Sequence, residues 1–120
     1  MTNEELEKYD SIELNDKVYF LSQKTPMTVK ARSKRYIILT EPFYRQRTFY
    51  HSIIDLDQGI KAPNDRIISP YDYSNQVDID MCLYDLIHGK VEVSQKRSME
   101  IDIDWEKTQA RKEKNSKKSK

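Results

Sequence analysis

The chain has 120 residues, of which 34% are charged and 37% hydrophobic, and its formal net charge is +1. This length predicts one small domain, and the low apolar content predicts a compact core with part of the chain unfolded. No apolar run approaches the roughly 18 residues of a membrane span, and no leader of the secretory type opens the chain. The single cysteine, Cys82, excludes an internal disulfide and a multi-thiolate metal site. We therefore expect a soluble cytoplasmic protein.

Charge is distributed unevenly along the chain. Residues 1–16 carry six acids and one base, residues 17–106 carry equal numbers of each, and residues 107–120 carry seven bases and one acid. The last block has almost no apolar side chain to bury, which predicts disorder. We therefore expect an acidic leader over 1–16 that forms a short helix, one globular β-rich domain over 17–106, and a disordered lysine-rich tail over 107–120.

The first half of the chain contains a short helix followed by strands. Thr2 or Asn3 is expected to cap the helix, because acids fill the first turn behind them. β-branched and aromatic residues then form runs separated by polar, proline or glycine turns, which predicts strands over 17–21, 28–31, 35–40, 48–56 and 60–63, with a short run at 67–69. Within this series, Asp57-Gln58-Gly59 predicts a tight turn in which glycine takes a positive φ.

The second half of the chain contains one strongly predicted helix and a predicted hairpin. The helix begins after a Ser74-Asn75 cap and ends before Gly89. Its apolar residues recur at helical spacing and predict a broad buried face, made of Val77, Met81, Tyr84 and His88 with Leu83, Leu86 and Ile87. Residues 91–93 and 99–105 alternate apolar and polar side chains, which predicts two hairpin strands with Met99, Ile101, Ile103 and Trp105 on one side.

These elements predict an α+β fold. We expect a small, strongly bent antiparallel sheet of five to seven strands with one helix packed on it and a disordered basic C-terminal tail. A sheet this small avoids exposed edges most easily by curling into an SH3-like barrel.

The residue types of several catalytic sites are present, but their spacing argues against an enzyme. His51 and Ser52 are adjacent on a strand and should point to opposite faces, so neither activates the other. Cys82 lies among apolar residues and is expected to be a buried structural thiol. Asp102, Asp104 and Glu106 offer carboxylates for a magnesium-dependent nuclease, although alternating acids on a solvated strand face explain them better. We therefore predict a non-enzymatic protein without a metal or other cofactor.

Binding chemistry is the stronger prediction. Residues 43–50 place two aromatic pairs around two arginines, and four basic residues lie shortly upstream. Rings beside guanidinium groups hold bases and phosphates in sequence-tolerant single-strand binders, and the lysine-rich tail adds salt-sensitive phosphate attraction. We therefore predict that DNA or RNA binds, mainly through phosphates, to Lys30, Arg32, Lys34, Arg35, Tyr44, Arg45, Arg47, Lys112, Lys117 and Lys118.

The rival hypothesis is a protein-interaction module. Tyrosine is enriched at protein interfaces, and residues 72–106 carry nine acids and three bases. In this reading, a host or phage protein concerned with replication or defence is bound or inhibited through Tyr71, Tyr73, Asp102 and Asp104.

One stretch of the chain resembles a known group of proteins. The pattern Thr28-Val29-Lys30-Ala31-Arg32, the strand from Arg35-Tyr36 to Phe43, the strand 50–56, Gly59 and the loop Pro63-Asn64-Asp65 are similar to small, functionally uncharacterised proteins of temperate phages and prophages of Gram-positive bacteria. The resemblance covers about residues 17–103. It implies a phage accessory protein acting in the cytoplasm of the bacterial host, and it implies no catalytic residue.

Overall fold

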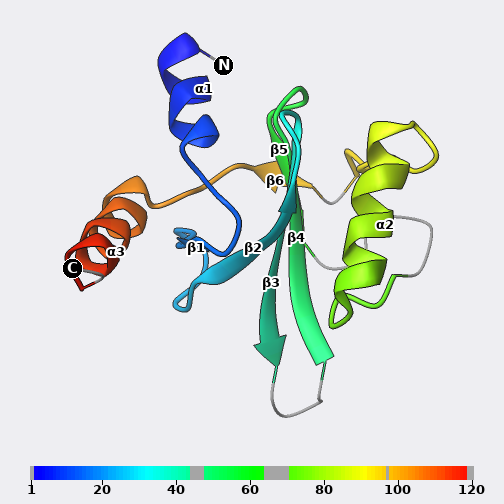
Figure 1. Ribbon diagram of the computed structural model, residues 1–120. Helices are drawn as coiled ribbons and strands as arrows, with labels where there is room; N and C mark the ends of the chain where they lie inside the picture. Colours follow the sequence, from blue (N-terminus) through cyan, green and yellow to red (C-terminus); the bar gives the residue numbers. More distant parts are fainter. Residues whose placement is uncertain (1, 44–47, 64–70, 97, 119–120) are drawn as a thin grey trace.

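The computed structural model describes residues 2–43, 48–63, 71–96 and 98–118, and its described part contains six strands and three helices (Figure 1). The strands form one antiparallel sheet in chain order, so that each strand pairs with the next. Their bounds are β1 Lys17–Val18, β2 Met27–Arg32, β3 Tyr36–Phe43, β4 Thr48–Asp55, β5 Ile60–Pro63 and β6 Met99–Glu100. The predicted α+β fold with a bent antiparallel sheet is confirmed. The predicted run 67–69 lies outside the described residues.

Both faces of the sheet are buried. Along β3 and β4, side chains alternate between two apolar clusters, so that Ile37 and Ile54 lie in one cluster while Ile38 and Ile53 lie in the other. The helix α2 (Gln76–Ile87) covers one face, and α1 (Asn3–Asp10) and α3 (Trp105–Lys118) lie on the other side (Figure 1). Strands that are buried on both faces have no exposed polar row, which is why their sequences are continuous apolar runs rather than alternating ones.

The sheet curls into a half-barrel because its two edge segments meet. Phe20, just after β1, forms an isolated antiparallel bridge with Ile103, just after β6. The amide of Leu21 donates to the Asp102 carbonyl at 2.8 Å, and the amide of Asp104 donates to the Tyr19 carbonyl at 2.7 Å. These bonds satisfy backbone groups that would otherwise remain open at the edges of the sheet.

The hairpin predicted for residues 91–93 and 99–105 is wrong. Residues 91–93 form no strand, and β6 pairs instead with β5, where Ile60 faces Glu100 and Lys61 faces Met99. Val93 is buried in the α2-side cluster, whereas Ile103 is buried in the cluster on the other face. The ladder position beside β6 is occupied by β5, and residues 91–93 pack Val93 against the α2 side of the sheet without joining a strand ladder.

The ends of α1 and α2 agree with the sequence prediction, but the buried face of α2 does not. Thr2 caps α1, Asn75 caps α2 by accepting from two backbone amides, and Gly89 follows α2 with a φ of +71°. The buried side chains of α2 are Ile79, Cys82 and Leu86. The stripe of Val77, Met81 and Tyr84, which was predicted to be buried, faces outward.

Residues 105–118 form α3, where the sequence predicts the end of a strand and a disordered tail. Tertiary contacts hold the first turns of this helix. Asp104 Oδ1 accepts from the Lys107 amide at 3.1 Å, and Thr108 Oγ1 accepts from the Tyr19 amide at 3.0 Å. Trp105 packs edge-on against Tyr9 with 5.0 Å between ring centroids. Of the described helices, none is long and apolar enough to cross a membrane.

A buried ion pair joins the closing segments to the sheet. Lys61 is only 1% exposed, and its Nζ lies 2.6 Å from Asp102 Oδ1, 3.3 Å from Ser22 Oγ and 3.9 Å from the centroid of the Phe20 ring. Burial opposes ionisation of Asp102, but hydrogen bonds from Lys61 and Ser22 outweigh it and hold the pKa of the carboxyl below its usual value.

Replacing Asp102 with alanine should therefore lower the free energy of unfolding by about 3–5 kcal/mol, because it leaves a buried ammonium group without its partner. The double variant Lys61→Met/Asp102→Leu should be clearly more stable than Asp102→Ala, since it removes both charges. Urea unfolding followed by circular dichroism measures both values. Equal loss in the two variants would show that Asp102 contributes through the hydrogen bond that its carboxylate accepts from the Ser22 amide rather than through this pair.

Candidate functional site

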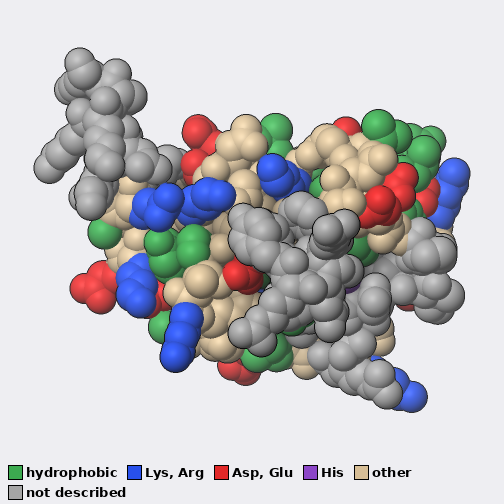
Figure 2. Space-filling model, turned by 90° about the horizontal axis from the view of Figure 1, so that it is seen from below, with side chains coloured by type: hydrophobic (Ala, Val, Ile, Leu, Met, Phe, Trp, Pro, Cys, Tyr) green, Lys and Arg blue, Asp and Glu red, His purple; other side chains and the backbone are tan. Residues whose placement is uncertain are grey.

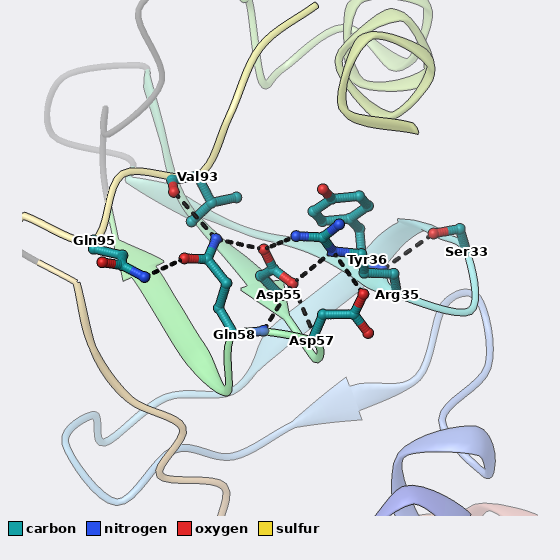
Figure 3. Close-up of polar contacts among 8 residues, drawn as sticks. All are labelled: Ser33, Arg35, Tyr36, Asp55, Asp57, Gln58, Val93 and Gln95. Atoms are coloured by element: carbon teal, nitrogen blue, oxygen red, sulfur yellow. Dashed lines mark hydrogen bonds and ion pairs between the residues drawn. The ribbon is translucent and has the colours of Figure 1, made fainter. Parts of the chain in front are cut away.

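Arg35 is the best-defined of the basic residues predicted to bind nucleic acid, and it is held in an ion pair within the fold although 42% of its side chain is exposed (Figure 3). Its Nε and Nη2 donate to the two carboxylate oxygens of Asp55 at 2.9 and 3.0 Å, and Nε also lies 3.4 Å from Asp57 Oδ2. The hydrogen bond to Asp55 raises the pKa of Arg35 above its usual value. The guanidinium lies over the Tyr36 ring at 4.9 Å.

Asp55 is the centre of this network. Its carboxylate is fully buried, and it accepts from the backbone amides of Asp57 and Gln58 and from the Gln58 side chain, the last at 2.7 Å. Burial opposes ionisation, but the hydrogen bonds from Arg35 and Gln58 outweigh it and lower the pKa of Asp55. The carboxylate therefore fixes the β4–β5 turn to the β2–β3 loop.

The network also positions the irregular segment after α2. Gln58 Nε2 donates to the Val93 carbonyl at 3.4 Å, and Gln95 Nε2 donates to Gln58 Oε1 at 2.8 Å (Figure 3). An open groove of about 1070 Å³ runs between this segment, the end of α2 and Arg35. Its charged lining is mixed, with Arg35, Lys90, Lys96 and Glu92. This composition does not single out an anionic ligand.

Arg32 is also committed to the fold. Its Nη1 donates to the carbonyls of Tyr9 at 2.7 Å and Ile12 at 2.5 Å. Burial lowers the pKa of this guanidinium, while Asp10 acts in the opposite direction. A cation at the C-terminal end of a helix is favourable, and Arg32 thereby attaches α1 to the sheet.

The remaining predicted nucleic-acid residues are not brought together. Lys34 is exposed at the β2–β3 loop, whereas the Lys30 carbonyl accepts from Gln76 at the start of α2. Among the described residues, no ion pair involves either lysine. Tyr44, Arg45 and Arg47 and the side chains of Lys112, Lys117 and Lys118 lie outside the described part of the structure.

The residues of the protein-interaction alternative are engaged in internal contacts. Tyr73 is 7% exposed and stacks on His51 with 3.6 Å between ring centroids, and the Tyr71 hydroxyl donates to Asp85 at 2.6 Å. Asp102 pairs with Lys61, and Asp104 caps α3. These four residues therefore do not form one free contact surface.

The residues that were considered as catalytic groups or metal ligands lie at structural positions in the fold. His51 and Ser52 are consecutive on β4, and both are buried. Burial raises the pKa of the Cys82 thiol to about 11, and its sulfur lies 3.8 Å from the Tyr73 hydroxyl. Asp102, Asp104 and Glu106 do not form a metal-ligating group, and no other group of three such side chains does so within the described ranges.

The structure brings together a basic and aromatic group that the sequence analysis did not find. Arg111 Nη1 donates to the Tyr19 hydroxyl at 3.1 Å, and Lys107 Nζ lies 5.9 Å from the centroid of the same ring. We call these three residues the Tyr19 cluster. Figure 2 shows Lys and Arg side chains gathering over the half of the molecule that carries β1 and α3, with some acidic side chains among them.

The spacing of the basic residues after Trp105 is the sequence signal from which this group could have been predicted. Lys107 and Arg111 are four residues apart, a spacing that places both on one side of a helix, and the basic residues at 114 and 118 continue intervals of three and four in the sequence. The prediction of disorder over 107–120 left this pattern without meaning, because only a helix brings residues with such spacing to one side.

Comparisons with known proteins do not extend this description: no family model, curated protein or solved structure matches the chain.

The lowered pKa of Asp55 predicts that the stability of the fold depends on pH. Because the folded-state pKa of Asp55 is lowered, its stabilisation is present above the ordinary aspartate pKa and is lost as the pH falls through the folded value. Asp55→Asn should therefore lower the free energy of unfolding by about 2–3 kcal/mol at pH 7, and the difference from the wild type should shrink in acid. Asp57→Asn is the control, since its exposed carboxylate should contribute less than about 0.5 kcal/mol. Urea unfolding between pH 7 and 2 tests both, and a difference that is constant with pH contradicts the role of the charge.

Proposed function

We propose that this chain is a non-enzymatic protein that binds nucleic acid through the Tyr19 cluster and the basic side of α3. The resemblance of residues 17–103 to small phage and prophage proteins supports the further proposal that it acts as a phage accessory protein in the bacterial cytoplasm. The observation that carries the first proposal is the pairing of the Tyr19 ring with two cations, Lys107 at 5.9 Å from the ring and Arg111 at 3.1 Å from its hydroxyl.

This group has the parts that a phosphate-tracking surface needs. Lys107 and Arg111 are exposed, and no ion pair among the described residues involves them. An aromatic ring beside such cations offers a stacking platform for an unpaired base. The chain continues past Arg111 with Lys112, Lys114, Lys117, Lys118 and Lys120 against one acid, which adds sequence-independent attraction to phosphates.

A local basic surface allows a protein with a net charge of only +1 to attract nucleic acid. Nucleic acid responds to the local potential rather than to the sum of charges over the molecule. The helix α3, which carries Lys107 and Arg111, and the helix α2, within the acidic segment, lie on opposite sides of the sheet (Figure 1). A polyanion is therefore expected to approach from the α3 side, with the sheet between it and the acidic segment.

Replacing Lys107 and Arg111 with alanine should weaken binding to a fluorescent duplex or single-stranded oligonucleotide. If both residues contact phosphates of the duplex, the slope of log affinity against log salt should become shallower by about 1.8 units. Fluorescence anisotropy at 50–200 mM salt measures this slope. The matched control is Lys90→Ala/Lys96→Ala, which removes the same charge from exposed positions beside α2, and equal weakening in the control would overturn the assignment of the site.

A chain that ends at Arg111 separates the tail from the cluster. It keeps Trp105, Thr108 and the Tyr19 cluster, and it loses five lysines. The melting temperature should stay close to that of the full chain, while affinity for the duplex at 50 mM salt should fall at least tenfold, since each phosphate contact adds to the salt-dependent attraction. Unchanged affinity would show that residues 112–120 contribute no phosphate contact.

A further inference from the structure

The outward face of α2 exposes an apolar stripe. Val77, Met81, Tyr84 and Ile87 are 71%, 52%, 49% and 53% exposed, and together they follow the helix for three turns. The same helix buries Ile79, Cys82 and Leu86 against the sheet. A helix that is apolar on its outer as well as its inner face is typical of one that is covered on both sides. We call these four exposed residues the α2 stripe.

The aromatic member of the stripe is held in place before any partner binds. The Tyr84 ring stacks on His88 with 4.0 Å between ring centroids, and Lys90 Nζ lies 5.2 Å from the Tyr84 centroid. The His88 ring is itself fixed by a contact of 2.9 Å between Nδ1 and the Tyr84 carbonyl. A ring with restricted rotamers loses less conformational entropy on binding, which favours its use as an interface anchor.

Carboxylates flank the stripe on both sides. At 3.6 residues per turn, the exposed Asp80 falls on one side of the line from Val77 to Tyr84. The half-buried Asp78 and Asp85, which also accept hydrogen bonds from the Asp72 amide and the Tyr71 hydroxyl, fall on the other. Residues 71–92 carry five acids and one lysine. The sheet lies between α2 and α3, and α3 carries two residues of the Tyr19 cluster (Figure 1). The two surfaces therefore select partners of opposite charge.

From this combination we propose that the α2 stripe is a docking site for an amphipathic helix of a partner protein, with apolar residues on one face and Lys or Arg along both borders. The apolar face of that helix covers Val77, Met81 and Tyr84, and its basic borders meet the carboxylates. This is packing of one helix against another with complementary charge. The site does not depend on the nucleic-acid function proposed above.

The carboxylates beside the α2 stripe disfavour nucleic acid, anionic membranes and a second copy of this stripe as its partner. Nucleic acid and anionic membrane surfaces are repelled by the carboxylates of α2. A second copy of this chain packed through the same stripe would bring Asp78 beside Asp85 of the other copy in the antiparallel orientation, and beside Asp80 in the parallel one. Like charges facing each other across an interface are unfavourable. Packing of two copies through this stripe is therefore disfavoured, and a basic partner helix is favoured.

The test uses the full chain and two synthetic 15-residue amphipathic helices, which carry leucine on one face and either lysine or glutamate on the other. The lysine peptide, titrated into ¹⁵N-labelled protein, should shift amide resonances of α2 and bind at least tenfold more tightly than the glutamate peptide. The triple variant Val77→Ser/Met81→Ser/Tyr84→Ser should lose at least tenfold in affinity for the lysine peptide. Asp80→Asn should weaken binding severalfold and make it less sensitive to salt.

The matched control is Leu14→Ser/Leu21→Ser, which removes exposed leucines elsewhere on the surface and should bind the lysine peptide as the wild type does. Four results overturn the proposal: no binding of the lysine peptide, equal binding of the two peptides, equal loss in the control, or shifts centred on α3. Sedimentation of the wild type as a dimer and of the triple variant as a monomer would also overturn it, because the occupant would then be a second copy.

Discussion

The two faces of the central sheet are both apolar, and neither can be left in water. Ile37 and Ile54 on one face and Ile38 and Ile53 on the other are almost completely buried. Burying such side chains stabilises the fold by about 1.5–3 kcal/mol each, so a cover on each face is obligatory. The helix α2 provides one cover, and α1 with the segment leading into α3 provides the other. The position of every candidate surface follows from this division.

Charged residues are used inside the fold as well as on its surface. Lys61 with Asp102, Arg35 with Asp55, and Arg32 with the carbonyls at the end of α1 each connect two segments that are distant in the chain. Directional bonds of this kind fix which segments meet, whereas apolar packing alone tolerates alternatives. Composition therefore overstates how many cations are available to a ligand.

The surfaces that remain are chemically opposite and physically separated. The Tyr19 cluster presents cations beside an aromatic ring, and the α2 stripe presents apolar side chains between carboxylates. Because the sheet and its two clusters lie between them, one molecule has room for a polyanion and a basic protein helix at the same time.

Local sequence determined the elements whose signals are themselves local. Strand composition, the caps Thr2 and Asn75, and the turn glycine Gly59 predicted most of the sheet and both ends of α2, since propensity and capping act within a few residues. Only the tertiary structure decided which face of α2 is buried, that residues 105–118 are helical, and that Arg32 and Arg35 bind acceptor groups of the fold. Those outcomes depend on partners far along the chain: Tyr19 for Thr108, Asp55 for Arg35, and Tyr9 for Arg32 and Trp105. A pattern of spacing cannot name such partners, because the free energy that selects them is gained only when distant segments pack together.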